Sequence, residues 1–225
     1  METSMRVLSH VDGSAVVSNN GTKVICSVSG PMEPKSRQEL PTQLALEIIV
    51  KPAEGVQSTR EKLMEDQIRS VLTPVLARYL HPRQFVQICF QVLEAGESKD
   101  YTVKEVSVGI NAAVLALVDA GVPLLSMCTG TCIGITSEER RLIVNPTEPE
   151  LLECASVHVF CLELGTDENE KIDVRNVLLV DSLGTFDESQ LFQVLETGEK
   201  ECIRLYTELR SVIKDKVSRD FVWKQ

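Results

Sequence analysis

The segment Val106–Asp119 constrains the fold most, because it has the length of a helix and is apolar on nearly every face. Its apolar residues do not fall on one stripe and include Ile110, Ala113, Val114 and Leu117. Gly121 and Pro123 follow and predict the end of the helix. Because a helix of this kind is buried on several sides, other elements have to pack around it.

Strand signals lie on both sides of this segment. The stretch SAVVSNNGTKVICSV predicts a β-hairpin, because Asn20 and Gly21 tolerate the positive φ angles of a tight turn. Further strands are predicted at Leu44–Val50, Gln84–Glu94, the runs LLSMCTGTCIGI and RLIV, Val157–Leu164 and Val174–Val180.

Three capping-box patterns predict where other helices begin. Ser58 and Glu61 open a helix whose buried face runs from Met64 to Tyr79, with Pro74 at a kink or in the last turns. Thr147 and Glu150 open a short helix, and Thr185 and Glu188 open a long C-terminal one. The buried stripe of the C-terminal helix is predicted to contain Leu191, Val194, Leu195, Cys202, Leu205, Leu209 and Ile213.

The order of these elements predicts an α+β fold with helices packed against β-sheets. The two halves resemble each other in element order, strands and then a helix, and we expect residues 1–225 to form a single domain. Two polar, charged connections, Ala95–Lys104 and Gly165–Lys171, are expected to be exposed and mobile.

Composition limits the classes of function. No apolar run reaches the roughly 20 residues that span a bilayer, and the N-terminus resembles no signal peptide, so we expect an intracellular protein without a membrane partner. The seven cysteines lie mostly in apolar runs and lack zinc-ligand spacing, which predicts buried thiols, no metal site and no cofactor. The net charge of −10 argues against a stand-alone RNA-binding module.

Catalytic signals are weak. There is no P-loop, G-x-S-x-G or HExxH motif, and the histidines at positions 10, 81 and 158 favour structural roles. Asp181 and Asp187 flank a turn and could pair for metal binding or acid–base chemistry. Each also suits a structural role, Asp181 at a strand end and Asp187 in the first turn of a helix.

Several stretches, in their order along the chain, resemble the RNase PH family. They are GSAVVSNNGTKV with the following Gly30-Pro31, HPRQFVQI, QVLEAG, INAAVLALVDAGVP and VNPTEPE, and together they span about residues 12 to 215. Within this family the chain is most similar to the non-catalytic subunits of the eukaryotic RNA exosome ring. The resemblance implies the RNase PH-like fold (ribosomal protein S5 domain 2-like), with two similar halves of β-sheet packed with helices.

The resemblance also implies partners and a location. The expected partners are other RNase PH-like subunits, paired as heterodimers in a ring of six, RNA-binding cap subunits and associated nucleases. RNA is expected to pass through the assembled channel. The implied role is structural support for 3′-to-5′ RNA processing and degradation, including rRNA maturation, in the nucleus, nucleolus and cytoplasm.

The positions that the family uses for catalysis are altered here. Its phosphate-binding Gly-Thr-Arg loop falls, by the match to INAAV, on Lys104, Glu105 and Val106, where a glutamate would repel phosphate. Its two aspartates fall on Asn145 and Leu151, which bring no negative charge. The resemblance therefore implies a subunit that is not an enzyme. The alternative is an active phosphorolytic or hydrolytic ribonuclease with a relocated acidic site around Asp181 and Asp187.

Any contact with RNA requires basic side chains. The candidates are Arg140 and Arg141 at a predicted turn, Lys99 and Lys104 in the first polar connection, and Arg83 beside a strand. A solvated surface role is the competing interpretation for each of them. The sequence leaves open whether the connection at residues 95–104 contacts RNA or protein.

Overall fold

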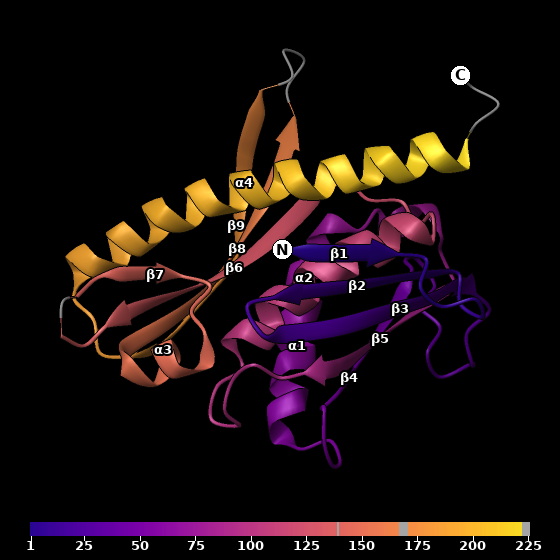
Figure 1. Cartoon of the computed structure of the whole chain (residues 1–225). Coiled ribbons are helices and arrows are strands. Elements are labelled where there is room, and N and C mark those ends of the chain that lie inside the picture. The colour runs from indigo at the N-terminus through magenta and orange to yellow at the C-terminus, as the bar shows by residue number, and fades with distance from the viewer. Residues whose placement is uncertain (139, 167–170, 222–225) are drawn as a thin grey trace.

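The computed structural model describes residues 1–138, 140–166 and 171–221, which form two β-sheets and the helices packed on them (Figure 1). The first sheet has five strands in the order β1-β2-β3-β5-β4, and the second has four in the order β7-β6-β8-β9. The strands are β1 (Glu2–Met5), β2 (Gly13–Asn19), β3 (Thr22–Met32), β4 (Ala45–Lys51), β5 (Phe85–Glu94), β6 (Met127–Thr136), β7 (Leu142–Val144), β8 (Cys154–Thr166) and β9 (Ile172–Gly184). The helices are α1 (Thr59–Val75), the 3-10 turn η1 (Arg78–Leu80), α2 (Val103–Asp119), α3 (Glu148–Glu153) and α4 (Glu188–Asp220).

Helix α2 lies at the centre and touches strands of both sheets, including β2, β3, β6 and β8. Every residue from Val103 to Leu117 is buried, which confirms the burial predicted for the apolar segment from Val106 to Leu117. Its buried amide at Asn111 exchanges two hydrogen bonds with Gly130 of β6, at 2.8 and 2.9 Å. Gly130 allows this close approach, because a Cβ there would lie 3.2 Å from the Ser107 carbonyl oxygen. The core of the molecule is therefore built around α2.

The predicted hairpin is confirmed. Strands β2 and β3 pair antiparallel with Asn19 opposite Thr22, and Asn20 and Gly21 between them have φ angles of 44° and 84°. Both angles lie in the left-handed region that Asn and Gly adopt most readily, so the Asn-Gly pair sets the register of the hairpin. The turn places Asn20 beside the start of α2, where its carbonyl accepts a hydrogen bond from Lys104.

Helix α4 crosses the second sheet and continues over the first half of the molecule (Figure 1). The predicted stripe is buried at Val194, Cys202, Leu205 and Leu209, and its other members are half-buried. Near the C-terminal end, Lys216 forms an ion pair with Asp119 at the end of α2. Leu209 belongs to the main hydrophobic core around α2, whereas Cys202 and Val194 belong to two smaller clusters against the second sheet.

Two of the predicted capping boxes are confirmed, at Ser58–Glu61 and Thr147–Glu150, and the third is wrong. The N-cap of α4 is Asp187, whose partner in the box is Gln190. Thr185 directly follows the last residue of β9, Gly184, and its amide still donates to the Ala155 carbonyl oxygen at 3.1 Å, which holds it against the sheet. Asp187 therefore precedes the first turn instead of lying in it.

The connection at Ala95–Lys104 also differs from its prediction as an exposed segment. Helix α2 begins at Val103, three residues earlier than expected, so Lys104 and Glu105 are helical. Glu97, Thr102 and Lys104 are buried, with 6%, 8% and 2% of their surface exposed. Of the second connection, Gly165–Lys171, the first two residues belong to β8 and Lys171 is exposed, while 167–170 lie outside the described residues. No helix in the described parts of the chain is long and apolar enough to cross a membrane.

Candidate functional site at the start of the central helix

The N-terminus of α2 lies beside both regions to which the resemblance to RNase PH assigns altered catalytic positions. Lys104 lies in the first turn of α2, and its Nζ donates to the backbone oxygens of Asn20 and Gly96, both at 2.8 Å. The Asn20 side chain in turn donates to the backbone oxygen of Asn145 at 2.6 Å. One hairpin residue thus connects the start of α2 to the segment between β7 and α3.

The side-chain carboxyl group of Glu97 occupies the N-terminal end of α2. The amides of Lys104 and Glu105 donate to Glu97 Oε2 and Oε1, at 3.1 and 2.9 Å. Free amides at a helix N-terminus attract anions, and a phosphate or carboxylate bound there is stabilised by the helix dipole. Here the buried side chain of Glu97 takes that place. Burial raises the pKa of the Glu97 carboxyl to about 7.

Further acidic side chains surround this place. The Arg60 guanidinium contacts Glu105 at 2.9 Å and Glu61 at 3.3 Å, and it lies 3.9 Å from Glu97. Its Nε also donates to the Tyr101 carbonyl oxygen at 3.0 Å. One arginine therefore faces three buried carboxylates, a balance that disfavours a second anion beside them.

The ammonium of Lys104 offsets little of the negative charge of these carboxylates. Burial lowers the pKa of its ammonium, while the negative charges of Glu97, Glu148 and Glu150 act in the opposite direction. These charges also show that α3 lies near the start of α2. Because the ammonium is enclosed and bonded to two backbone oxygens, the geometry disfavours Lys104 as an RNA contact.

Asn145 and Leu151 have structural contacts. Asn145 is buried with a φ of 51°, its Oδ1 accepts from Thr131 Oγ1 and the Cys132 amide at 3.4 Å, and its Nδ2 faces Glu201 at 3.4 Å. Leu151 is 1% exposed and belongs to the hydrophobic core. Val106, in the second turn of α2, is buried in the same core. In the described residues, no group of three or more His, Cys, Asp or Glu side chains is placed to hold a metal ion.

Asp181 and Asp187 are held by different elements. Asp181 accepts a hydrogen bond from Gln67 of α1 at 2.7 Å, and Asp187 caps α4 and pairs with Arg140 at 3.0 Å. They share no partner in the described contacts. The nearby His158 is hydrogen-bonded to Ser156 and Ser182, and burial lowers its pKa, which favours the neutral imidazole.

The basic candidates lie on different parts of the surface. Arg140 and Arg83 are exposed, and their nearest acidic partners are Asp187 at 3.0 Å and Glu39 at 3.6 Å. Lys99 is exposed between β5 and α2. The structure thus groups neither Lys99 nor Arg83 with the Arg140–Arg141 pair. Their roles toward RNA stay predictions.

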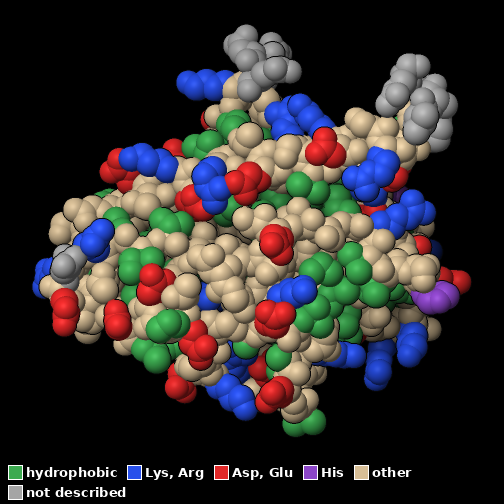
Figure 2. Space-filling view, viewed as in Figure 1, with side chains coloured by type: hydrophobic (Ala, Val, Ile, Leu, Met, Phe, Trp, Pro, Cys, Tyr) green, Lys and Arg blue, Asp and Glu red, His purple; other side chains and the backbone are tan. Residues whose placement is uncertain are grey.

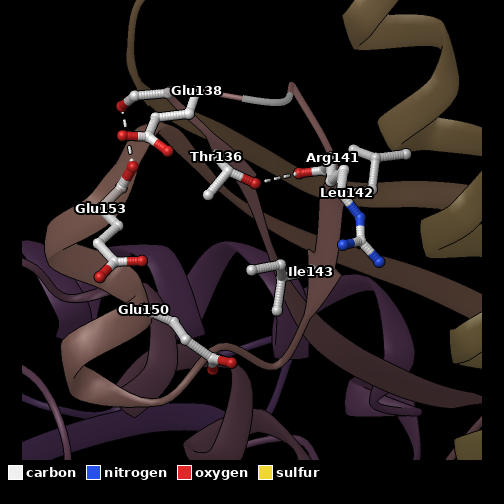
Figure 3. Close-up of a pocket in the computed structure, with 8 residues that line it drawn as sticks. Thr136, Glu138, Arg141, Leu142, Ile143, Glu150 and Glu153 are labelled. Carbon is white, nitrogen blue, oxygen red and sulfur yellow. Dashed lines mark hydrogen bonds between the residues drawn. The ribbon is translucent and has the colours of Figure 1, made fainter.

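Arg141 borders a cavity of about 670 Å³ between β7 and α3. Figure 3 shows Arg141 and Glu150 extending toward this cavity from its two sides. The acidic residues Glu138 and Glu153 also line it. With three carboxylates and one guanidinium among its described lining residues, the cavity suits RNA phosphates poorly.

The sequence did not identify Glu97, Arg60 or Asn20 as members of this site. An acidic residue just before a helix is a known preference, but Glu97 lies seven positions before Lys104, too far for a capping pattern. Arg60 and Glu105 belong to different helices. Only the folded structure shows that these side chains meet.

Comparisons with known proteins agree with this architecture. The sequence model of the 3′ exoribonuclease family, domain 1 (RNase_PH), matches residues 1–123. Exosome complex component RRP46 of Saccharomyces cerevisiae is 51% identical over 219 residues, 97% of each chain. Exosome complex component rrp46 of Schizosaccharomyces pombe is 31% identical over 198 residues, 85% of this chain and 80% of that one.

The fold has a close counterpart among solved structures. The crystal structure of rice (Oryza sativa) Rrp46 superposes with a TM-score of 0.81, covering 95% of this chain and 93% of that one at 22% sequence identity. The predicted α+β, RNase PH-like fold is confirmed by this match together with the two observed sheets.

Proposed function

Because the chain belongs to the RNase PH family of 3′ exoribonucleases, we propose that it is a non-catalytic, structural subunit of the RNA exosome core ring. One observation carries the assignment to the exosome: the similarity to a yeast exosome component extends over nearly the whole of both chains. A shared length and fold favour a shared place in an assembly, because the surfaces that bind neighbours are distributed over the whole domain.

The lack of activity is supported by the start of α2. Glu97 occupies the helix N-terminus, and Glu105 adds a second carboxylate where a phosphate would need positive charge. On the other side of the site, Asn145 carries no charge and Leu151 has no side-chain oxygen. A phosphorolytic enzyme needs both a bound phosphate and an acid or metal centre, and neither is favoured by these residues.

The proposal includes the partners that the resemblance implies. The chain acts as one domain that pairs with another RNase PH-like subunit in a ring of six. RNA-binding cap subunits and associated nucleases join the ring, and RNA passes through its channel, in nucleus, nucleolus and cytoplasm. The net charge of −10 supports this division of labour, because the partners then supply most of the positive surface that RNA needs.

A labelled-RNA degradation assay tests the proposal. The purified chain is incubated with RNA, with and without inorganic phosphate and magnesium, and the products are separated. We expect no phosphate-dependent release of nucleoside diphosphates. Release that persists in clean preparations would contradict the proposal.

The alternative hypothesis, an active ribonuclease with a relocated acidic site, is tested by the double variant Asp181→Asn with Asp187→Asn. Any activity that depends on a relocated acidic site disappears in this double variant, whereas a contaminating nuclease is unaffected. The separate partners of the two aspartates, Gln67 and Arg140, do not favour this alternative.

A further inference from the structure

A cleft of about 690 Å³ opens between the connection from β4 to α1 and the segment that follows β5. Figure 1 shows both connections at the lower edge of the molecule, below the first sheet. The cleft extends inward to Glu97 and Glu105, at the start of α2. It is therefore a surface entrance to the acidic cluster around Arg60.

The charge of the cleft is predominantly negative. Its described lining contains five glutamates, of which Glu61, Glu97 and Glu105 are buried and Glu54 and Glu94 lie exposed at the rim. Two basic side chains oppose them. Arg60 is bound to the buried glutamates, and Lys99 is exposed at the rim. A cation entering the cleft would be attracted, and a phosphate chain would be repelled.

The rim of the cleft also carries an exposed apolar side chain on each side. Val56, in the connection from β4 to α1, is 89% exposed, and Leu93 at the end of β5 is 47% exposed. At the lower edge, Figure 2 shows a protruding hydrophobic side chain with acidic side chains beside it. Apolar side chains around a charged pocket are typical of protein interfaces, where they exclude water from the polar contact.

We propose that this cleft is a docking site for a neighbouring protein subunit, which inserts a lysine or arginine side chain flanked by an apolar residue. The cationic head contacts the exposed carboxylates of Glu54 and Glu94 at the rim, and the apolar neighbour packs between Val56 and Leu93. The inference rests on the proposed function only in taking the partner to be a member of the same assembly. It assigns the segment at residues 95–104 to protein contact, because five glutamates disfavour RNA.

Photo-crosslinking in the assembled native complex tests the docking site. Val56 is replaced by benzoylphenylalanine, which its exposure tolerates, and the crosslinked peptides are identified by mass spectrometry. The same photo-reactive residue at Leu152, exposed on α3, is the control for random contact. We expect the Val56 position to capture a protein segment that contains lysine or arginine beside an apolar residue.

A charge reversal provides the second arm. Glu54→Lys with Glu94→Lys should lower the crosslink yield about tenfold, because like charges across an interface repel. Glu188→Lys with Glu199→Lys, both exposed on α4, changes the net charge equally and should leave the yield unchanged. Capture of RNA, capture of an acidic segment, absence of a crosslink above the Leu152 control, or a yield insensitive to the rim reversal would each overturn the inference.

The mass of the crosslinked complex separates this inference from the proposed function. An intact assembly of exosome subunits without the basic crosslink refutes the docking site alone. A basic crosslink from a complex that contains no other RNase PH-like subunit refutes the proposed function and leaves the docking site standing.

Discussion

The substitution Glu97→Gln tests the placement of the buried carboxylate at the start of α2. Burial raises the Glu97 pKa from an ordinary value of 4.5 to about 7. The folded protein therefore holds a proton in a pH range where the unfolded chain has already released it. Stability from this proton is fully present below pH 4.5 and is lost as the pH rises through about 7. Glutamine cannot titrate, so this loss is absent in the variant.

The size of the effect follows from the pKa difference. A shift from 4.5 to about 7 corresponds to about 3 kcal/mol in the free energy of unfolding. Glutamine keeps one acceptor for the amides of Lys104 and Glu105 and loses the other, at a cost of about 1 kcal/mol that does not depend on pH. Relative to wild type, the variant should gain about 3 kcal/mol between pH 4.5 and pH 8.

Urea unfolding followed by circular dichroism, at a series of pH values and low protein concentration, measures this difference. Glu94→Gln removes a carboxylate from an exposed position three residues away and serves as the matched control. We expect the difference between Glu97→Gln and wild type to change with pH and the difference for the control to stay flat. Parallel stability curves for wild type and Glu97→Gln would refute a buried Glu97 carboxyl with a raised pKa.

Three further predictions concern activity, RNA and assembly. Asn145→Asp should not restore phosphate-dependent RNA degradation, because Glu97 still fills the start of α2; diphosphate release by this variant would contradict the account. If Arg140 and Arg141 lie on the RNA path, Arg140→Glu with Arg141→Glu in the assembled complex should lower RNA affinity and flatten its salt dependence. Unchanged RNA binding by an intact ring would show that neither arginine lies on the RNA path. Expressed alone, the chain should self-associate, because β9 is an edge strand with Val177 and Val180 exposed; co-expression with a related ring subunit should rescue solubility, and a stable monomer at high concentration would count against this.

The central part of the fold follows from local signals. The Asn20-Gly21 turn, the Ser58 cap and the largely apolar stretch of α2 from Val106 each depend on residues close together in the chain, and the structure confirms all three. The start of α4 shows where local signals are insufficient. Two capping patterns overlap there, and the hydrogen bond from Thr185 to Ala155 holds the chain against the sheet long enough for the helix to begin after Asp187.

The candidate site could be predicted only in part, for the same reason. The sequence predicts which residues stand at the family's catalytic positions, because they lie next to recognisable stretches, and this assignment stays a prediction. It does not show that Glu97 bonds to α2, because that contact depends on the path of the chain between Ala95 and Thr102. The exposure expected for Lys104 is wrong because the charged head reaches two backbone oxygens inside the fold, a solution that composition cannot reveal.

The mass and composition of the native complex test the central claim most directly. The chain is tagged at its genomic locus, purified under mild conditions and measured by native mass spectrometry. We predict one copy of the chain together with several different RNase PH-like subunits and RNA-binding cap subunits, in a complex that survives nuclease treatment. A free monomer, or an assembly made only of copies of this chain, would contradict the claim.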